Sequence, residues 1–320
     1  MTAPLIDLKP DTRKLLEEAL AGLKATPRHL PCKYFYDAVG ARLFEQICEL
    51  PEYYPTRTEI SILRRYLPDM AQHIGPQARI VEYGSGEGLK IRLLLDALSS
   101  PAAYTAIDIS REQLQRAANA LSESYPAVDI QPVCADYSSA LSLPRPTHNF
   151  RRTVVFFPGS TIGNFAPAEA LGLLRRFAAL AQQGQEPGGL LVGVDLKKDR
   201  QRVEAAYNDS RGITAQFNLN LLQRLNREVG ANFCLEHWQH RAYWNPTQGA
   251  IEMHLVSQRE QQVKINGDAF LFSPGDSVHT ENSFKYTVEE FTELAASAGF
   301  QPEACWLDDD NLFSVHYFTL

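Results

Sequence analysis

Several features that define whole classes of proteins are missing from this sequence of 320 residues. Its five cysteines are scattered and form no CxxC pair, which argues against a disulfide framework and against a thiolate zinc site. The chain has neither repeats nor low-complexity tracts, and no apolar run approaches the roughly 18 residues of a membrane span. The opening stretch, MTAPLIDLKPDTRK, has no basic region followed by an apolar core. We therefore expect a cytoplasmic protein without a membrane partner.

An excess of basic residues is missing too. The formal net charge is -7, which argues against a nucleic-acid partner because phosphate binding needs a clustered Lys/Arg surface. Hydrophobic residues make up 44% and charged residues 22%, as in ordinary globular proteins. The CLEHWQH stretch (Cys234, His237, His240) lacks a second ligand group at structural-zinc spacing, so we predict no metal site. A small-molecule substrate and, by default, a monomer are expected.

From residue 78 onward, apolar strands alternate with helical segments. The strands read ARIVEY, YTAIDIS, DIQPVCADY, RRTVVFFPG and GGLLVGVDLK. Nearly continuous apolar strands that alternate with helices predict a parallel sheet covered on both faces. In YTVEEFTELAASAGF, Thr287 and Glu290 are spaced as in a helix-capping box. The last two runs, PEACWLDD and LFSVHYFTL, predict an antiparallel hairpin at the edge of the sheet.

Two other segments break this rhythm and predict a second domain. One contains the helical ITAQFNLNLLQRLNREVG and the alternating AIEMHLVSQREQQVKI, which indicate an insertion with its own small β-sheet. The other is the N-terminal segment, in which the Pro-flanked ELPEYYPT predicts an extended loop. We assign residues 12–60 and 199–285 to an α+β substrate-binding domain, and residues 61–198 and 286–320 to the domain with the parallel sheet.

A glycine-rich turn follows the first strand of that sheet. In EYGSGEG, glycines 84, 86 and 88 let backbone N–H groups and a helix N-terminus approach a ligand closely. The dinucleotide pattern G-x-G-x-x-G requires glycine at position 89, where this chain has Leu89. The pattern present, E-x-G-x-G-x-G from Glu82, is typical of class I methyltransferases that bind S-adenosylmethionine. The predicted fold class is therefore α/β, with a Rossmann-like class I methyltransferase sheet.

Two aspartates follow the next two strands. Asp108 lies where a carboxylate can accept both ribose hydroxyl protons, in S-adenosylmethionine as in NAD. Asp136, beside Tyr137, is placed to accept from the adenine amino group while the aromatic ring covers the base. Either aspartate is equally suited to cap the helix that follows it.

Longer strings carry a more specific resemblance. KYFYDAVGARLFEQICELPEYYPTRTE, EYGSGEGLKIRLLLDAL, FFPGSTIGNF, IEMHL and HTENSFKYT make the chain resemble, over nearly its whole length, the L-histidine Nα-methyltransferases of the ergothioneine pathway. Members of that family trimethylate the α-amino group of histidine to give hercynine, with S-adenosylmethionine as the cofactor.

The resemblance implies three sets of site residues. The set at the reacting amine comprises Tyr36, Gly159 and Asn164. Substrate binding is assigned to Tyr53, Asn164, Tyr207, Met253, Glu281 and Ser283, of which Glu281 and Ser283 hold the imidazole nitrogens and Met253 packs against the ring. Cofactor binding is assigned to Glu82, Gly84, Ser85, Gly86, Lys90, Asp108, Asp136 and Tyr137.

The residues themselves leave alternatives open. Glu281 and Ser283, two apart on an extended segment, face one side and offer an imidazole one acceptor and one donor-acceptor, but they also fit the polar face of any strand. A methyltransferase acting on a thiohistidine or another amino acid has the same fold, and so does a module that binds S-adenosylmethionine without transfer. An NAD-dependent oxidoreductase is disfavoured by Leu89.

Overall fold

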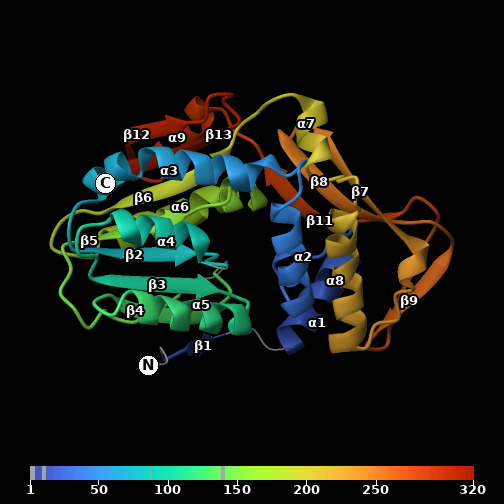
Figure 1. Ribbon diagram of the computed structural model, residues 1–320. Coiled ribbons are helices and arrows are strands. Elements are labelled where there is room, and N and C mark those ends of the chain that lie inside the picture. Colours follow the sequence, from blue (N-terminus) through green and yellow to red (C-terminus); the bar gives the residue numbers. More distant parts are fainter. Residues whose placement is uncertain (1–3, 9–11, 87, 138–140) are drawn as a thin grey trace. The chain divides into compact units, whose positions relative to one another are not determined.

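The structure, a computed structural model, describes residues 4–8, 12–86, 88–137 and 141–320 (Figure 1). The chain divides into two compact units. Unit 1 comprises Met1–Lys9, Pro55–Lys197 and Lys285–Leu320, and unit 2 comprises Pro10–Tyr54 and Lys198–Phe284. Each unit is therefore assembled from segments that are far apart in the sequence.

Unit 1 contains an eight-stranded sheet in the order β1-β4-β3-β2-β5-β6-β13-β12. Its strands are β1 (Ile6–Leu8), β2 (Ala78–Tyr83), β3 (Ala103–Asp108), β4 (Asp129–Ala135), β5 (Arg152–Phe157), β6 (Gly189–Asp195), β12 (Gln301–Leu307) and β13 (Phe313–Thr319). The first six are parallel, whereas β13 is antiparallel to β6 and to β12, so the parallel sheet and the edge hairpin are confirmed. The strand order reverses between β2 and β5, and ligands of open α/β sheets bind at the strand carboxyl ends near such a point.

Helices cover both faces of this sheet (Figure 1). The helical elements of unit 1 are α3 (Tyr54–Ile74, whose first residue belongs to unit 2), α4 (Leu89–Ala97), α5 (Arg111–Ser124), η2 (Thr161–Asn164), α6 (Pro167–Ala181) and α9 (Val288–Ala296). Apolar side chains of α3, α4 and α5 share one buried cluster with the sheet. On the other face, the Phe177 ring of α6 lies 4.7 Å from Tyr83 and 5.1 Å from Phe157. Both faces of the central strands are therefore buried, which explains their nearly continuous apolar sequences.

Unit 2 combines helices with two small antiparallel sheets. Its helical elements are α1 (Thr12–Lys24), η1 (Cys32–Phe35), α2 (Ala38–Cys48), α7 (Arg200–Ala205), α8 (Ile213–Val229) and η3 (Leu235–His237). Its strands are β7 (Trp238–Asn245), β8 (Ala250–Ser257), β9 (Gln261–Ile265), β10 (Asp268–Phe272) and β11 (Ser277–Phe284), paired as β11-β8-β7 and β10-β9. The predicted helix and the predicted small β-sheet of the insertion are both present.

Local sequence explains several element ends, and in one place it misled. Thr287 accepts from the N–H of Glu290 at 3.1 Å while the Glu290 carboxylate accepts from the N–H of Thr287 at 2.8 Å, which confirms the capping box of α9. The extended loop predicted for ELPEYYPT is wrong from Tyr54 onward, where α3 begins. Pro55 fits the first helical turn because the missing N–H has no intrahelical partner there. None of the helices described is long and apolar enough to cross a lipid bilayer.

Candidate functional site

The glycine turn lies at the carboxyl end of β2 and leads into α4. Gly84, Gly86 and Gly88 have φ of 76°, 51° and 77°, in the left-handed region that side chains other than glycine rarely adopt. The Gly84 N–H donates to the Ile107 carbonyl at 2.8 Å, and the Gly86 N–H donates to the Asp108 carboxylate at 3.0 Å. The turn is thus held against the end of β3, and the three glycines are explained by backbone conformation.

Asp108 connects the glycine turn to the loop after β3. Its second oxygen accepts from the Ser110 N–H at 2.8 Å. Burial raises the pKa of Asp108, and the backbone donors at Ser110 and Gly86 act against that rise. A carboxylate has about four lone-pair sites, so it retains acceptor capacity beyond these two backbone N–H groups.

Glu82 is a buried acid, 1% exposed, near the end of β2 and just before the glycine turn. Its carboxylate accepts a hydrogen bond from the Tyr104 hydroxyl of the neighbouring strand. Burial raises the pKa of Glu82 to about 8, although the Tyr104 hydrogen bond and the charge of Lys90 favour the ionised form. Its ionisation therefore responds to any cation that binds beside it.

Asp136 and Tyr137 follow β4 at the same edge of the sheet. Asp136 is buried, and the Tyr137 ring lies edge-on to Tyr83 at a centroid distance of 5.7 Å. A Cβ built on Gly84 would lie 3.5 Å from the Tyr137 hydroxyl oxygen. The structure thus brings Tyr137 to the glycine turn, although 53 positions separate them in the sequence.

A buried glutamate that sequence reasoning missed joins two predicted site residues. Glu59 of α3 is 1% exposed, and its carboxylate lies 2.5 Å from the Lys90 ammonium and accepts from the Gly159 N–H at 2.9 Å. A Cβ at position 193 would lie 2.0 Å from Glu59 Oε1, so a larger residue there would displace the Glu59 carboxylate. The sequence does contain a signal for Glu59. It precedes the buried Ile62 by three positions and Leu63 by four, so it lies on the apolar face of the helix.

Gly159 and Asn164 lie in the turn after β5, at the carboxyl end of that strand. Gly159 has φ of 81° and Ser160 has φ of 55°, and the Ser160 hydroxyl accepts from the Asp195 N–H at 2.9 Å. Asn164 is the last residue of η2 and is partly exposed. Strand-end turns of this kind are where open α/β sheets place ligand-binding groups.

Three of the predicted site residues, Tyr36, Tyr53 and Tyr207, belong to an aromatic cluster in unit 2. The Tyr53 ring lies 6.2 Å from Phe44 and 6.3 Å from Tyr207, and the Tyr36 ring lies 5.6 Å from Phe44. Phe217 of α8 completes the cluster, 5.7 Å from Tyr36. Burial, together with the nearby Tyr207, Tyr36 and Glu281, raises the pKa of Tyr53 well above its usual value. The hydroxyl of Tyr53 is therefore a neutral hydrogen-bonding group.

Glu281, Ser283 and Met253 lie on adjacent strands of the three-stranded sheet. Glu281 and Met253 are directly opposite each other across β11 and β8, and directly opposed residues share a face. Ser283 follows on the same face, and its hydroxyl accepts from the Tyr207 hydroxyl at 2.7 Å. Both polar side chains are buried, Glu281 at 9% and Ser283 at 4% exposure. A buried carboxylate beside a buried hydroxyl and a thioether is a suitable surface for a small polar ring.

The predicted residues thus divide between the two units. Unit 1 holds the cofactor set together with Gly159 and Asn164, and unit 2 holds Tyr36, Tyr53, Tyr207, Met253, Glu281 and Ser283. Glu59, Phe44 and Phe217 contact members of these sets but were not assigned a role from the sequence. Within the described ranges, no group of three or more His, Cys, Asp or Glu side chains is arranged to hold a metal ion.

The sequence is similar to those of several known proteins. The sequence model of a family described as "Histidine-specific methyltransferase, SAM-dependent" matches residues 15–320. The Histidine N-alpha-methyltransferase of Mycolicibacterium smegmatis is 40% identical over 306 residues, which cover 94% of this chain and 93% of that protein. Its counterpart in Mycobacterium tuberculosis is 38% identical, with coverage of 94% and 93%. Ergothioneine biosynthesis protein 1 of Neurospora crassa is 33% identical over 88% of this chain and 32% of that protein.

Proposed function

We propose, because this chain belongs to the family of S-adenosylmethionine-dependent, histidine-specific methyltransferases, that it methylates the α-amino group of L-histidine. Three successive transfers would give hercynine, the trimethylated amino acid, for ergothioneine biosynthesis. The observation that carries the choice of acceptor is the buried Glu281 carboxylate beside the Ser283 hydroxyl, which offers partners to both nitrogens of an imidazole.

The residues of unit 1 fit the cofactor. Gly84 and Gly86 present no side chain at their positions in the turn, and Asp108 retains acceptor sites suited to two ribose hydroxyls. Asp136 and Tyr137 are assigned to the adenine amino group and ring. The Lys90 ammonium is held by the Glu59 carboxylate, so we assign Lys90 to orient the part of the cofactor site next to Glu59. S-Adenosylmethionine supplies the electrophilic methyl group when it is bound.

The remaining task of the protein is to present a neutral amine. The α-amino group must lose a proton before each transfer, and no nucleophilic side chain is needed. We assign Asn164 to orient the lone pair and Tyr36, through water, to accept hydrogen bonds from the amine as the proton leaves. The carbonyl of Gly159 and the faces of the tyrosine rings can stay next to the cationic amine as it gains methyl groups, because they form no bonds to it that each transfer must break. Substitution Asn164→Ala should then lower turnover, and unchanged turnover would remove this role.

Mass spectrometry of the products tests the proposal. The purified protein is incubated with S-adenosylmethionine and an equimolar mixture of the twenty amino acids. Histidine alone should gain methyl groups and accumulate in the trimethyl form. Methylation of a different amino acid, or of thiohistidine in preference to histidine, would reassign Glu281 and Ser283. Cofactor binding without formation of S-adenosylhomocysteine would indicate a binding module.

A further inference from the structure

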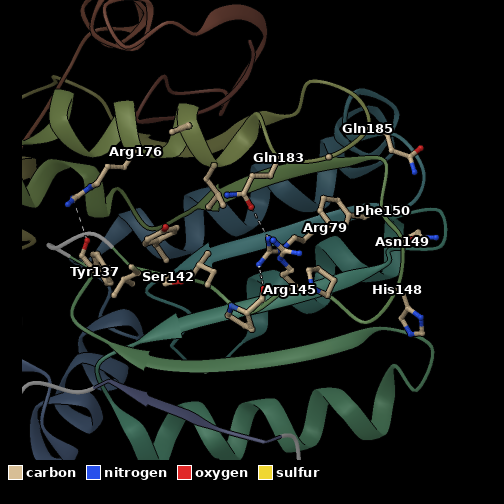
Figure 2. A pocket seen from close by; sticks show the side chains of 18 residues that line it. Arg79, Tyr137, Ser142, Arg145, His148, Asn149, Phe150, Arg176, Gln183 and Gln185 are labelled. Carbon is tan, nitrogen blue, oxygen red and sulfur yellow. Dashed lines mark hydrogen bonds between the residues drawn. The ribbon is translucent and has the colours of Figure 1, made fainter.

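A pocket of about 1020 Å³ lies in unit 1 on the α6 side of the sheet (Figure 2). It is lined by residues of β2, of α6 and its C-terminal end, and of the connection from β4 to β5. Parallel strands are usually connected through a helix, but the described part of this connection, residues 136–137 and 141–151, contains none. Irregular chain therefore replaces a packed crossover helix over this part of the sheet, and a cavity results.

Arg79 is the central side chain of this pocket (Figure 2). It projects from β2, is 2% exposed, and makes hydrogen bonds to three uncharged oxygens, those of Gln183 (3.4 Å), Thr105 (3.3 Å) and the Pro144 carbonyl (2.9 Å). Its Nε has no hydrogen-bond partner among the residues that the structure describes. Burial lowers the pKa of Arg79, the expected response of a cation removed from water, although the nearby Tyr83 and Asp129 act in the opposite direction. A buried guanidinium with an unused donor is suited to an anionic ligand.

Other basic side chains also line the pocket. Arg145, Arg176 and His148 also line the pocket, and none of its described lining residues is acidic, although the whole chain carries a formal charge of -7. Tyr83 and Phe150 contribute aromatic surface, with the Phe150 ring 5.9 Å from the Arg79 guanidinium carbon. The planar fork of arginine pairs in a bidentate manner with carboxylates and phosphates. A pocket lined by arginines and aromatic rings is suited to a ligand in which a small oxyanion is attached to a flat apolar body.

One end of the pocket reaches a residue of the cofactor set. Tyr137 and Arg176 lie together there (Figure 2), and the Arg176 Nη2 donates to the Tyr137 carbonyl at 3.5 Å. The Tyr137 side chain in turn lies next to Gly84 of the glycine turn. An anion that binds Arg176 competes for this donor and so acts on the segment assigned to the adenine.

We propose that this cavity, here named the Arg79 pocket, is a regulatory site for a small carboxylate or phosphate ester carried on a flat apolar body. Occupation of the Arg79 pocket weakens binding of S-adenosylmethionine, and the cofactor weakens binding of the anion by the same factor. The volume of about 1020 Å³ is at the upper end of the range for small-molecule sites.

Calorimetric titration of the full-length protein with three probes tests the site. Phenyl phosphate and benzoate carry the two oxyanions on the same ring, and benzyl alcohol is the neutral control. Saturable one-to-one binding is expected for at least one anion, and the tighter of the two identifies the chemical class. Absence of binding by both anions, or equal binding of benzyl alcohol, would overturn the proposal.

Variants of neighbouring arginines locate the bound anion. Arg176→Gln should weaken binding of the anion about tenfold, as expected for loss of one charge-assisted hydrogen bond. Arg175→Gln, an exposed arginine on the same helix outside the lining, should leave the affinity unchanged. Arg79→Lys keeps the charge but removes the fork and should weaken binding similarly. If Arg79→Lys does not fold, Arg145→Gln replaces it, and equal affinities across all the variants would place the anion elsewhere.

The regulatory part is measured separately. The dissociation constant of S-adenosylhomocysteine is determined with and without saturating anion, and a weakening of about fivefold is expected. An unchanged constant would leave a binding site without regulation and contradict that part of the proposal. None of these titrations requires methyl transfer, so their outcome is independent of whether histidine is the acceptor.

Discussion

The two units present their predicted functional residues in different ways. In unit 1, the cofactor residues lie at the ends of successive parallel strands, and much of the site is backbone: glycines with positive φ and N–H groups that donate to Asp108. In unit 2, the substrate residues are side chains from separate elements, joined by ring contacts and by the hydrogen bond from Tyr207 to Ser283. The proposed cofactor site thus depends largely on local chain conformation, whereas the proposed acceptor site depends on which side chains the fold brings together.

The largest effect expected concerns a buried ion pair in unit 1. Lys285 and Asp195 are 1% and 0% exposed, with Nζ and Oδ2 2.6 Å apart. Substitution Lys285→Met leaves a buried carboxylate without its cation and should lower the free energy of unfolding by about 3–5 kcal/mol. Urea unfolding measures this. Lys197→Met removes a neighbouring pair with Glu290 that is 38% and 45% exposed, and its cost should stay below about 1 kcal/mol. Equal costs for the two variants would show that burial does not distinguish the pairs.

The next largest effect is expected on cofactor binding, which should depend on unit 1 and not on unit 2. Asp108→Asn removes a charged acceptor from the proposed ribose site and should weaken S-adenosylhomocysteine binding about 10- to 100-fold. Calorimetry measures the dissociation constant. Glu281→Gln, in unit 2, is the matched carboxylate control and should leave that constant unchanged. A similar loss of S-adenosylhomocysteine affinity in both variants would mean that cofactor binding is not specific to the residues of unit 1.

The third effect is expected on the acceptor alone. Glu281→Gln replaces a buried acceptor and should raise the KM for histidine about tenfold, because an imidazole nitrogen loses its charged partner. Steady-state kinetics at saturating cofactor measure it. Asn282→Ala is the control: it lies on the opposite face of the same strand, where its side chain contacts His279. If both variants raise KM equally, the face of β11 that carries Glu281 and Ser283 is not the one that recognises the acceptor.

The smallest effect, counted per pH unit, is a pH dependence of stability from Glu82. Between pH 4.5 and about 8, the folded protein holds the Glu82 proton, whereas the unfolded chain has released it. The folded state then binds more protons, so the free energy of unfolding falls as pH rises through this window. Unfolding titrations at several pH values should show that Glu82→Gln reduces the fall by about 1 kcal/mol per pH unit or less.

Glu290 provides the contrast for that measurement. Its pKa is lowered: burial opposes the shift, and the hydrogen bonds from Lys197 and Thr287 outweigh it. Its contribution to stability is therefore present above pH 4.5 and is lost only in more acidic solution. Glu290→Gln should leave the slope between pH 6.5 and 8 unchanged. Identical slopes for the parent protein and Glu82→Gln would mean that Glu82 is ionised in the folded protein.

Much of unit 1 was predictable because its signals are local. Strand, glycine turn and helix occupy adjacent segments, and the capping box at Thr287 and Glu290 spans four residues. The strand β1 was not anticipated: its three residues, Ile6–Leu8, have no pattern of their own and are defined by parallel pairing with β4. The start of α3 at Tyr54 was missed because prolines on both sides of the tyrosines favour a loop when only sequence is considered.

The sequence by itself determined the alternation of strands and helices, the left-handed glycine turn and the family, since hydrophobic period and backbone preference are properties of short segments. Only the tertiary structure decided that Glu59 meets Lys90 and Gly159, that Tyr207 reaches Ser283, and that a cavity surrounds Arg79. Those contacts join residues 31 to 100 positions apart, and they exist because packing of the sheets and helices closes long loops. No local preference of the chain encodes which distant side chains will share a buried volume.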